Sequence, residues 1–315
     1  MRELTIKTKV LKLTDYKSVD FSDRFPKFSC DKEKLNGDIR RIQYANGEKK
    51  QADTVAPGDM VLLSCTSSHK HYQKNDIYVI VGRKLYSQEL EEKLIGLSKG
   101  RAEITVENVP VSVEIKGITR TVIPELTDEN VKKWGIEKVS TVEELKRYYF
   151  DRQVENFRDD NEEADMVNSM FAMEVLGNCT FEHDENERQA LIRSTQAQID
   201  KAKQMQDEDT DVDFVELAQM MILQTLNAAA LGYTLRKENG RLLTEADYKN
   251  ELENRAEILR ITPEKLSETY SKTDYALEFY SEYYFNTLYD YIGSAMKEYY
   301  YKQNKQRQAG RFLSQ

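Results

Sequence analysis

The sequence predicts an α+β protein, in which a small antiparallel β domain is followed by an extended all-helical domain with projecting arms. Apolar residues alternate at a period of two over several short segments before residue 125. From residue 140 they recur at about 3.6 residues, the period of a helix. We therefore place the β domain at residues 1–125, with 1–45 as an extension of unclear pattern, and the helical domain at residues 126–315.

Short segments with the pattern of half-buried strands carry the β prediction. They are residues 59–66, 76–82, 101–106 and 111–115. Residues 87–97 between them form a short amphipathic helix, with Leu90, Leu94 and Leu97 on one stripe. Residues 3–10 could pair onto the same sheet. The result is a small sheet crossed by one helix.

The helical domain opens with a long amphipathic segment. Ser140 and Glu143 match a capping box, and apolar residues then recur at helical spacing as far as residue 177. A single helix of this size would be about 50 Å long. The next helix, residues 184–205, carries so few apolar residues that we expect an exposed arm.

The last predicted helix is rich in tyrosine. Ten of the 19 tyrosines lie between Tyr270 and Tyr301. A packed seam is the simplest interpretation for the positions spaced at about 3.5 residues. Tyr280 and Tyr283 lie off that seam, so the helix presents aromatic rings on more than one face.

Charge and composition exclude several classes of protein. The formal net charge of −9 argues against nucleic acid as the main partner. No run approaches ~18 apolar residues, and charges interrupt the N-terminus where a signal peptide would be apolar, so we expect no membrane partner. Cys30, Cys65 and Cys179 form no CxxC pair, which favours a reducing compartment and a cytoplasmic location.

Motifs for catalysis or cofactor binding do not occur in the sequence. It contains no GxSxG, P-loop, GxGxxG or HExxH pattern. His69 and His71 could hold a metal as a pair, but an exposed loop is the simpler interpretation because no cysteine or carboxylate cluster lies nearby in sequence. We therefore expect no cofactor, no metal site and no conventional catalytic residues.

Residues 56–61, 81–97, 123–129 and 140–145 carry short motifs that follow one another in a recognisable order. In that order they resemble the trigger factor family, chaperones that carry an FKBP-type prolyl isomerase domain. The first two segments resemble parts of that domain, and the last two resemble the PELDDE and TxEEL motifs that follow it. Residues 243–266 are similar to a late helix pair of the family. The resemblance covers about residues 40–300 and implies an FKBP-like β domain followed by a chaperone domain.

Departures from the family pattern imply a degraded isomerase pocket. Residues 87–90 replace the family's isoleucine, proline, glycine and phenylalanine, and Cys65 replaces an aromatic residue of the first strand. An FKBP-type pocket desolvates the prolyl amide with aromatic side chains, so we expect weak isomerase activity or none. The remnant of this pocket would consist of Cys65, Leu85, Tyr86 and Leu90. The family's GFRxGKxP loop has no match in about the first fifty residues, so we expect no ribosome binding.

Three functions follow from these features. The resemblance favours a chaperone that holds unfolded polypeptides in a helical cradle, with client contacts from Met166, Met170, Phe171, Tyr280, Tyr283 and Tyr284. One alternative is an active isomerase with an unconventional pocket around Leu85, Tyr86 and Leu90. The other is an adaptor that binds one partner through the tyrosine-rich helix. An unoccupied apolar cradle could also associate with a second copy of the chain, so a homodimer is a further alternative.

Overall fold

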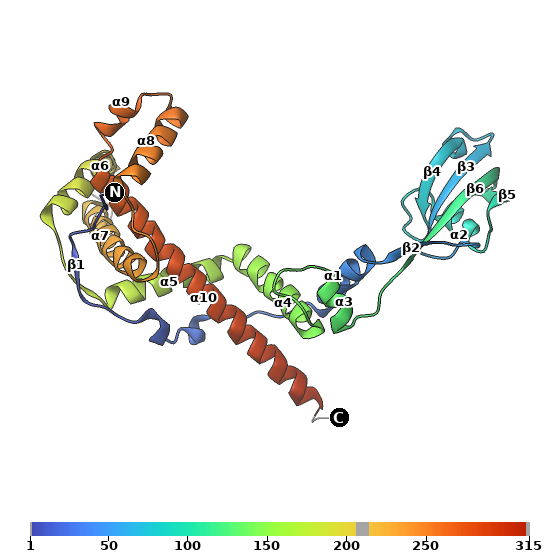
Figure 1. Ribbon diagram of the computed structural model, residues 1–315, viewed down its shortest axis with the longest axis horizontal. Helices are drawn as coiled ribbons and strands as arrows, with labels where there is room; N and C mark the ends of the chain where they lie inside the picture. Colours follow the sequence, from blue (N-terminus) through green and yellow to red (C-terminus); the bar gives the residue numbers. More distant parts are fainter. Residues whose placement is uncertain (1, 206–213, 313–315) are drawn as a thin grey trace. The chain divides into compact units, whose positions relative to one another are not determined.

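The computed structural model describes residues 2–205 and 214–312 and confirms an α+β protein with small antiparallel sheets (Figure 1). The chain divides into two compact units. We call Met1–Ser29 with Val154–Gln315 the helical unit, and Cys30–Gln153 the β unit. The predicted boundary near residue 125 differs from this division in two respects. The first 29 residues belong to the helical unit, and the second boundary lies between Gln153 and Val154, inside the helix that spans Val142–Asp159. Among the described residues, no helix is long and apolar enough to cross a membrane.

The β unit contains a five-stranded antiparallel sheet with the order β2-β6-β3-β4, and β5 pairs with β6. Its strands are β2 (Glu48–Gln51), β3 (Met60–Ser67), β4 (Lys74–Ile80), β5 (Gly100–Val106) and β6 (Val109–Val122). The 3-10 turn η3 (Lys70–Tyr72) joins β3 to β4, and helix α2 (Gln88–Leu94) follows β4. Leu90 and Leu94 of α2 are buried with Val61, Leu63 and Val113 of the sheet. The predicted strands and the predicted short helix are confirmed.

A second core in the β unit is helical, and the sequence did not predict its first helix. Its helices are α1 (Lys32–Ala45), α3 (Asp128–Lys133) and the first part of α4 (Val142–Asp159). They bury Ile39, Val131 and Leu145 together. The capping box of α4 lies one residue later than predicted: the Thr141 hydroxyl accepts from the Glu144 amide at 3.1 Å, and the Glu144 carboxylate accepts from the Thr141 amide at 3.0 Å.

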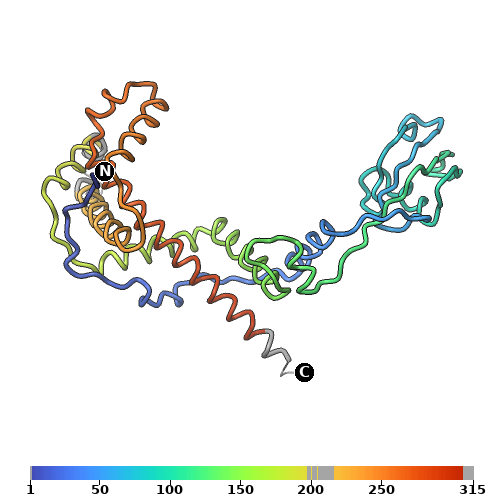
Figure 2. The backbone as a smooth tube through the Cα atoms, viewed as in Figure 1, coloured from blue at the N-terminus to red at the C-terminus, as the bar shows by residue number. Residues whose placement is uncertain are grey.

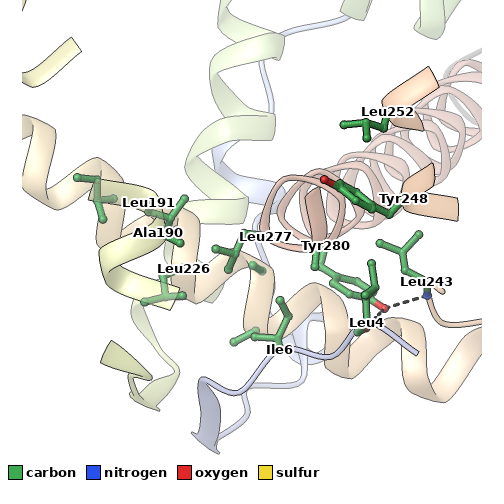
Figure 3. Packing of buried hydrophobic residues seen from close by; sticks show 14 of the residues in the cluster. Leu4, Ile6, Ala190, Leu191, Leu226, Leu243, Tyr248, Leu252, Leu277 and Tyr280 are labelled. Atoms are coloured by element: carbon green, nitrogen blue, oxygen red, sulfur yellow. Dashed lines mark hydrogen bonds between the residues drawn. The ribbon is translucent and has the colours of Figure 1, made fainter. Parts of the chain in front are cut away.

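The helical unit is built around two long helices that pack against each other. Its elements are β1 (Lys9–Lys12), η1 (Tyr16–Ser18), η2 (Ser22–Arg24), α5 (Glu162–Gly177), β7 (Thr180–Glu182), α6 (Glu185–Met205), α7 (Phe214–Asn239), α8 (Glu245–Leu259), α9 (Pro263–Ser267) and α10 (Lys272–Phe312). Leu226 of α7 and Leu277 of α10 are fully buried in the shared core (Figure 3). The helices cross at Gly232, where a Cβ atom would lie 1.8 Å from the Tyr280 carbonyl oxygen. Only glycine permits this approach.

The predicted single helix from 140 to 177 is wrong, because the structure breaks it into α4 and α5 after Asp159. Asn161 adopts an extended conformation, and its side chain accepts a hydrogen bond from the Ala164 amide at 3.1 Å. Asparagine at this position caps a new helix instead of continuing the old one. Acidic residues in the first turn of α5 further stabilise the new N-terminus.

The N-terminal segment lies along the helical unit (Figure 2) and not on the five-stranded sheet, so the predicted pairing of residues 3–10 with that sheet is wrong. The Leu4 amide donates to the Leu243 carbonyl at 2.8 Å, and β1 pairs with β7. The buried carboxylate of Glu187 accepts from the amides of Lys7 and Thr8 at 2.6 and 2.9 Å. These bonds satisfy backbone groups that a lone extended segment would leave unpaired.

The start of α6 also differs from the exposed arm that its composition predicts. Ala190 and Leu191 are buried in the core of the helical unit. Glu187, which contributes to the polar composition of α6, is buried as well, because it binds the N-terminal segment. A charged side chain is tolerated in this position since two backbone amides satisfy its carboxylate.

Candidate functional site

An open pocket of about 640 Å³ lies in the β unit, between η3, the start of α2 and the turn that joins β5 to β6. The side chains around it are mostly polar. They are His69, His71, Tyr72, Tyr86, Ser87, Gln88, Glu89, Glu92 and Glu107. Its volume falls within the range of about 300–1,000 Å³ that is typical of ligand sites.

A buried glutamate holds the loop that forms one wall of this pocket. Glu91 is only 1% exposed, and its carboxylate accepts four backbone hydrogen bonds. Oε2 accepts from Gly82 and Lys84 at 2.9 and 2.8 Å, and Oε1 accepts from Leu85 and Tyr86 at 3.0 and 3.3 Å. Charge-assisted bonds of this kind fix a loop strongly. Glu91 therefore positions Tyr86 at the pocket.

The aromatic wall of the pocket is assembled by Tyr86 and the residues of η3. The Tyr86 ring stacks on the His71 ring, with centroids 5.3 Å apart and planes within 8°. The Tyr86 hydroxyl donates to the His71 carbonyl at 2.7 Å. Burial raises the pKa of the Tyr86 and Tyr72 phenols, so both stay neutral around pH 7.

The rim of the pocket carries three carboxylates, and no lysine or arginine is among its described lining residues. Glu89 and Glu92 come from α2, whereas Glu107 lies in the turn between β5 and β6. The Glu89 carboxylate accepts from the Glu107 amide at 2.9 Å, which ties the turn to the helix. The pocket is therefore polar and negatively charged.

Of the four residues predicted for an isomerase pocket, the structure places one at this site. Tyr86 lines the pocket, but Leu85 is 78% exposed and lies outside its lining. Cys65 and Leu90 are fully buried in the core of the sheet, and burial raises the pKa of the Cys65 thiol to about 11. Neither side chain reaches the pocket surface.

Three of the six predicted client contacts are buried in the interior of the helical unit. Phe171, Tyr280 and Tyr284 are buried, and the Tyr284 hydroxyl donates to the Ala172 carbonyl at 2.6 Å. Tyr283 is half-buried, with the Arg236 guanidinium 4.9 Å from its ring centroid. These four rings hold helices together, so a client could reach the buried ones only if the helices separated.

Tyrosines of α10 bind the N-terminal segment at three points. Tyr280 donates to the Leu4 carbonyl at 3.1 Å, and Tyr291 donates to the Lys17 carbonyl at 3.1 Å. Tyr300 donates to a third carbonyl, that of Pro26, at 2.5 Å. A buried phenol needs a partner for its hydroxyl, and these backbone carbonyls supply it. Much of the tyrosine content of α10 therefore has a structural role.

The other predicted client contacts, Met166 and Met170, are exposed on α5 by 60% and 38%. Helix α7 carries a second exposed apolar group, Leu217, Met220 and Met221, whose spacing places them on one helical face. Methionine is flexible and polarizable, so it adapts to surfaces of different shape.

Metal binding has no candidate in the part of the chain that the structure describes. Within residues 2–205 and 214–312, no three His, Cys, Asp or Glu residues are placed to hold a metal ion. His69 and His71 lie at the aromatic pocket instead.

Comparisons with known proteins find similarity to trigger factor. No protein-family model matches the chain. Trigger factor of Clostridium botulinum (strain Eklund 17B / Type B) is 22% identical over 279 residues, which are 82% of this chain and 62% of that protein. The chain thus spans less than two thirds of the length of this curated relative. A solved trigger factor chaperone, studied for promiscuous substrate recognition in folding and assembly, is 13% identical with a TM-score of 0.30, over 94% of this chain and 80% of that one.

Proposed function

We propose that this protein is a chaperone that binds unfolded or partly folded polypeptides through exposed apolar side chains of its helical unit. The observation that carries the proposal is the exposure of methionines on two of its helices. Met166 and Met170 lie open on α5, and Met220 and Met221 are 47% and 58% exposed on α7. The similarity to trigger factor, named a chaperone, supports the same function.

The expected affinity is modest, as suits reversible holding of clients. Full burial of one methionine side chain contributes about 1.5–3 kcal/mol. These methionines are only 38–60% exposed, so a client segment that covers two of them gains about 1–4 kcal/mol before the ordering of both partners is subtracted. Single contacts would therefore bind weakly, and a long unfolded chain would bind through several contacts at once.

We place this activity in the cytoplasm and infer that prolyl isomerase activity is weak or absent. The transition state of prolyl rotation is stabilised by an apolar site that desolvates the amide. The pocket of the β unit carries three carboxylates and two imidazoles, and Leu90 points into the core beneath it. The alternative, an active isomerase with an unconventional pocket, would require this polar pocket to catalyse prolyl rotation.

Replacement of the exposed methionines tests the chaperone proposal. Met166, Met170, Met220 and Met221 would be changed together to glutamine, which keeps their length and favours helix. The matched control changes the same four to leucine, which retains the apolar area. We expect the glutamine variant to lose most of its suppression of client aggregation and the leucine variant to keep it. Equal suppression by both variants would contradict the proposal.

A further inference from the structure

The pocket of the β unit combines features that a client-binding helix face does not need. Three carboxylates surround one opening and come from two elements, α2 and the turn between β5 and β6. Because the Glu107 amide is bound by Glu89, the turn and the helix present their charges to the same space. The described lining residues include no lysine or arginine to neutralise this charge.

The aromatic wall is fixed before any ligand arrives. Tyr86 is held by Glu91 through its backbone, and by His71 through ring stacking and a hydrogen bond. Tyr72, which is almost fully buried, lies against both His69 and His71. A rigid aromatic surface beside carboxylates suits a flat cation, which stacks on a ring and donates from its edge.

From this geometry we propose that the pocket binds an arginine side chain of an extended polypeptide. The guanidinium donates to the carboxylates of Glu92 and Glu107, and its methylene stem lies along the Tyr86 ring. Arginine fits better than lysine because its planar fork can bind two carboxylates and stack at the same time. The pocket of about 640 Å³ also leaves room for the neighbouring peptide backbone. This proposal rests on the proposed chaperone function and gives the β unit a role in choosing client segments.

The three histidines of the chain provide a direct test with the full protein. His69 and His71 line the pocket, whereas His183 lies in the helical unit, bonded to Asn227 at 2.7 Å. Imidazole signals of ¹³C-histidine protein would be assigned with His69→Gln and His71→Gln variants. The probe is a blocked five-residue peptide with a central arginine, and the comparison peptide has citrulline, which keeps the shape without the charge.

We expect the arginine peptide to shift the His69 and His71 signals in a saturable way and to leave His183 unmoved. The citrulline peptide should bind at least about fivefold more weakly, since it loses the ion pairs. No shift, equal binding of both peptides, or a parallel shift of His183 would overturn the proposal. Tighter binding of an uncharged proline peptide would also overturn it.

A double variant tests how much the pocket carboxylates contribute to peptide binding. Glu92→Gln with Glu107→Gln should weaken the arginine peptide by about five- to tenfold, because each exposed ion pair contributes modestly. The control, Glu103→Gln with Glu137→Gln, makes the same charge change at exposed positions outside the pocket. Equal weakening in both variants would show a general charge effect and refute the site. The peptide titration tests arginine binding by the pocket, and the aggregation assay tests client binding by the helical unit. Either proposal can therefore fail while the other holds.

Discussion

Tyr280→Phe removes one hydroxyl from the centre of the helical unit and leaves the ring in place. This hydroxyl accepts from the Leu243 amide and donates to the Leu4 carbonyl, both at 3.1 Å (Figure 3). The ring is fully buried, and burial raises the pKa of the phenol to about 12, so the donor is retained through neutral pH. The change therefore tests whether α10 holds the N-terminal segment through its tyrosines.

The magnitude follows from the two backbone groups that lose a partner. The two groups are the Leu243 amide and the Leu4 carbonyl, and each buried group left unsatisfied costs about 1–3 kcal/mol. We therefore expect the free energy of unfolding of the helical unit to fall by about 2–6 kcal/mol. No cavity contributes, because the volume of the ring is unchanged.

Hydrogen exchange measured by mass spectrometry, together with urea unfolding followed by circular dichroism, would test this expectation. Peptides that cover residues 2–12 and 242–248 should exchange faster in Tyr280→Phe, whereas the β unit should be unchanged. The matched control is Tyr283→Phe, which makes the same chemical change on a half-buried ring three residues along α10. We expect less than about 0.5 kcal/mol for the control. Equal stability of both variants would refute the structural role of Tyr280.

The remaining predictions concern a helix crossing, a loop and an acid response. Gly232→Ala should destabilise the helical unit by at least about 1–3 kcal/mol in urea unfolding, because its Cβ would meet the α10 backbone; Gly37→Ala, with open space around it, should stabilise α1 instead. Glu91→Gln should speed hydrogen exchange in residues 82–86 and leave the helical unit unchanged, since an amide nitrogen would face backbone donors; unchanged exchange would contradict this. Hydrogen bonds from Arg120 hold the pKa of Asp59 below its usual value, so their stabilisation is present above about pH 4 and is lost as pH falls through the folded-state pKa. Asp59→Asn should flatten this acid dependence in pH-resolved unfolding, and an unchanged slope would argue against the pair.

Periodicity was sufficient to predict the elements whose buried faces are regular. Burial alternates along most of β3, β5 and the first part of β6, and Leu90 and Leu94 mark the buried stripe of α2, so these elements could be located from the sequence. The break between α4 and α5 was missed because the apolar spacing continues across Asn161. Only the local preference of asparagine for a cap indicates that break.

Contacts between distant segments could not be predicted from one sequence. Nothing near Leu4 indicates that it meets Leu243 and Tyr280, which follow it by more than 200 residues. Glu91 has the same appearance as any acidic residue in a first helical turn, yet it lies buried among loop amides. The one sequence feature that could have indicated the burial of Glu91 is its position next to Leu90, on the buried side of α2. In the same way, tyrosines that form a client surface and tyrosines that bind a chain segment have the same sequence pattern.

The most direct test of the central claim is to measure aggregation suppression and prolyl isomerase turnover on the same preparation. An aggregation-prone client whose refolding does not depend on proline would be diluted from denaturant with and without the full chain, and turnover would be followed on a short proline peptide. We expect aggregation to be suppressed in proportion to the amount of protein, without turnover above the uncatalysed rate. Turnover without suppression would contradict the account and would make the pocket around Tyr86 a catalytic site.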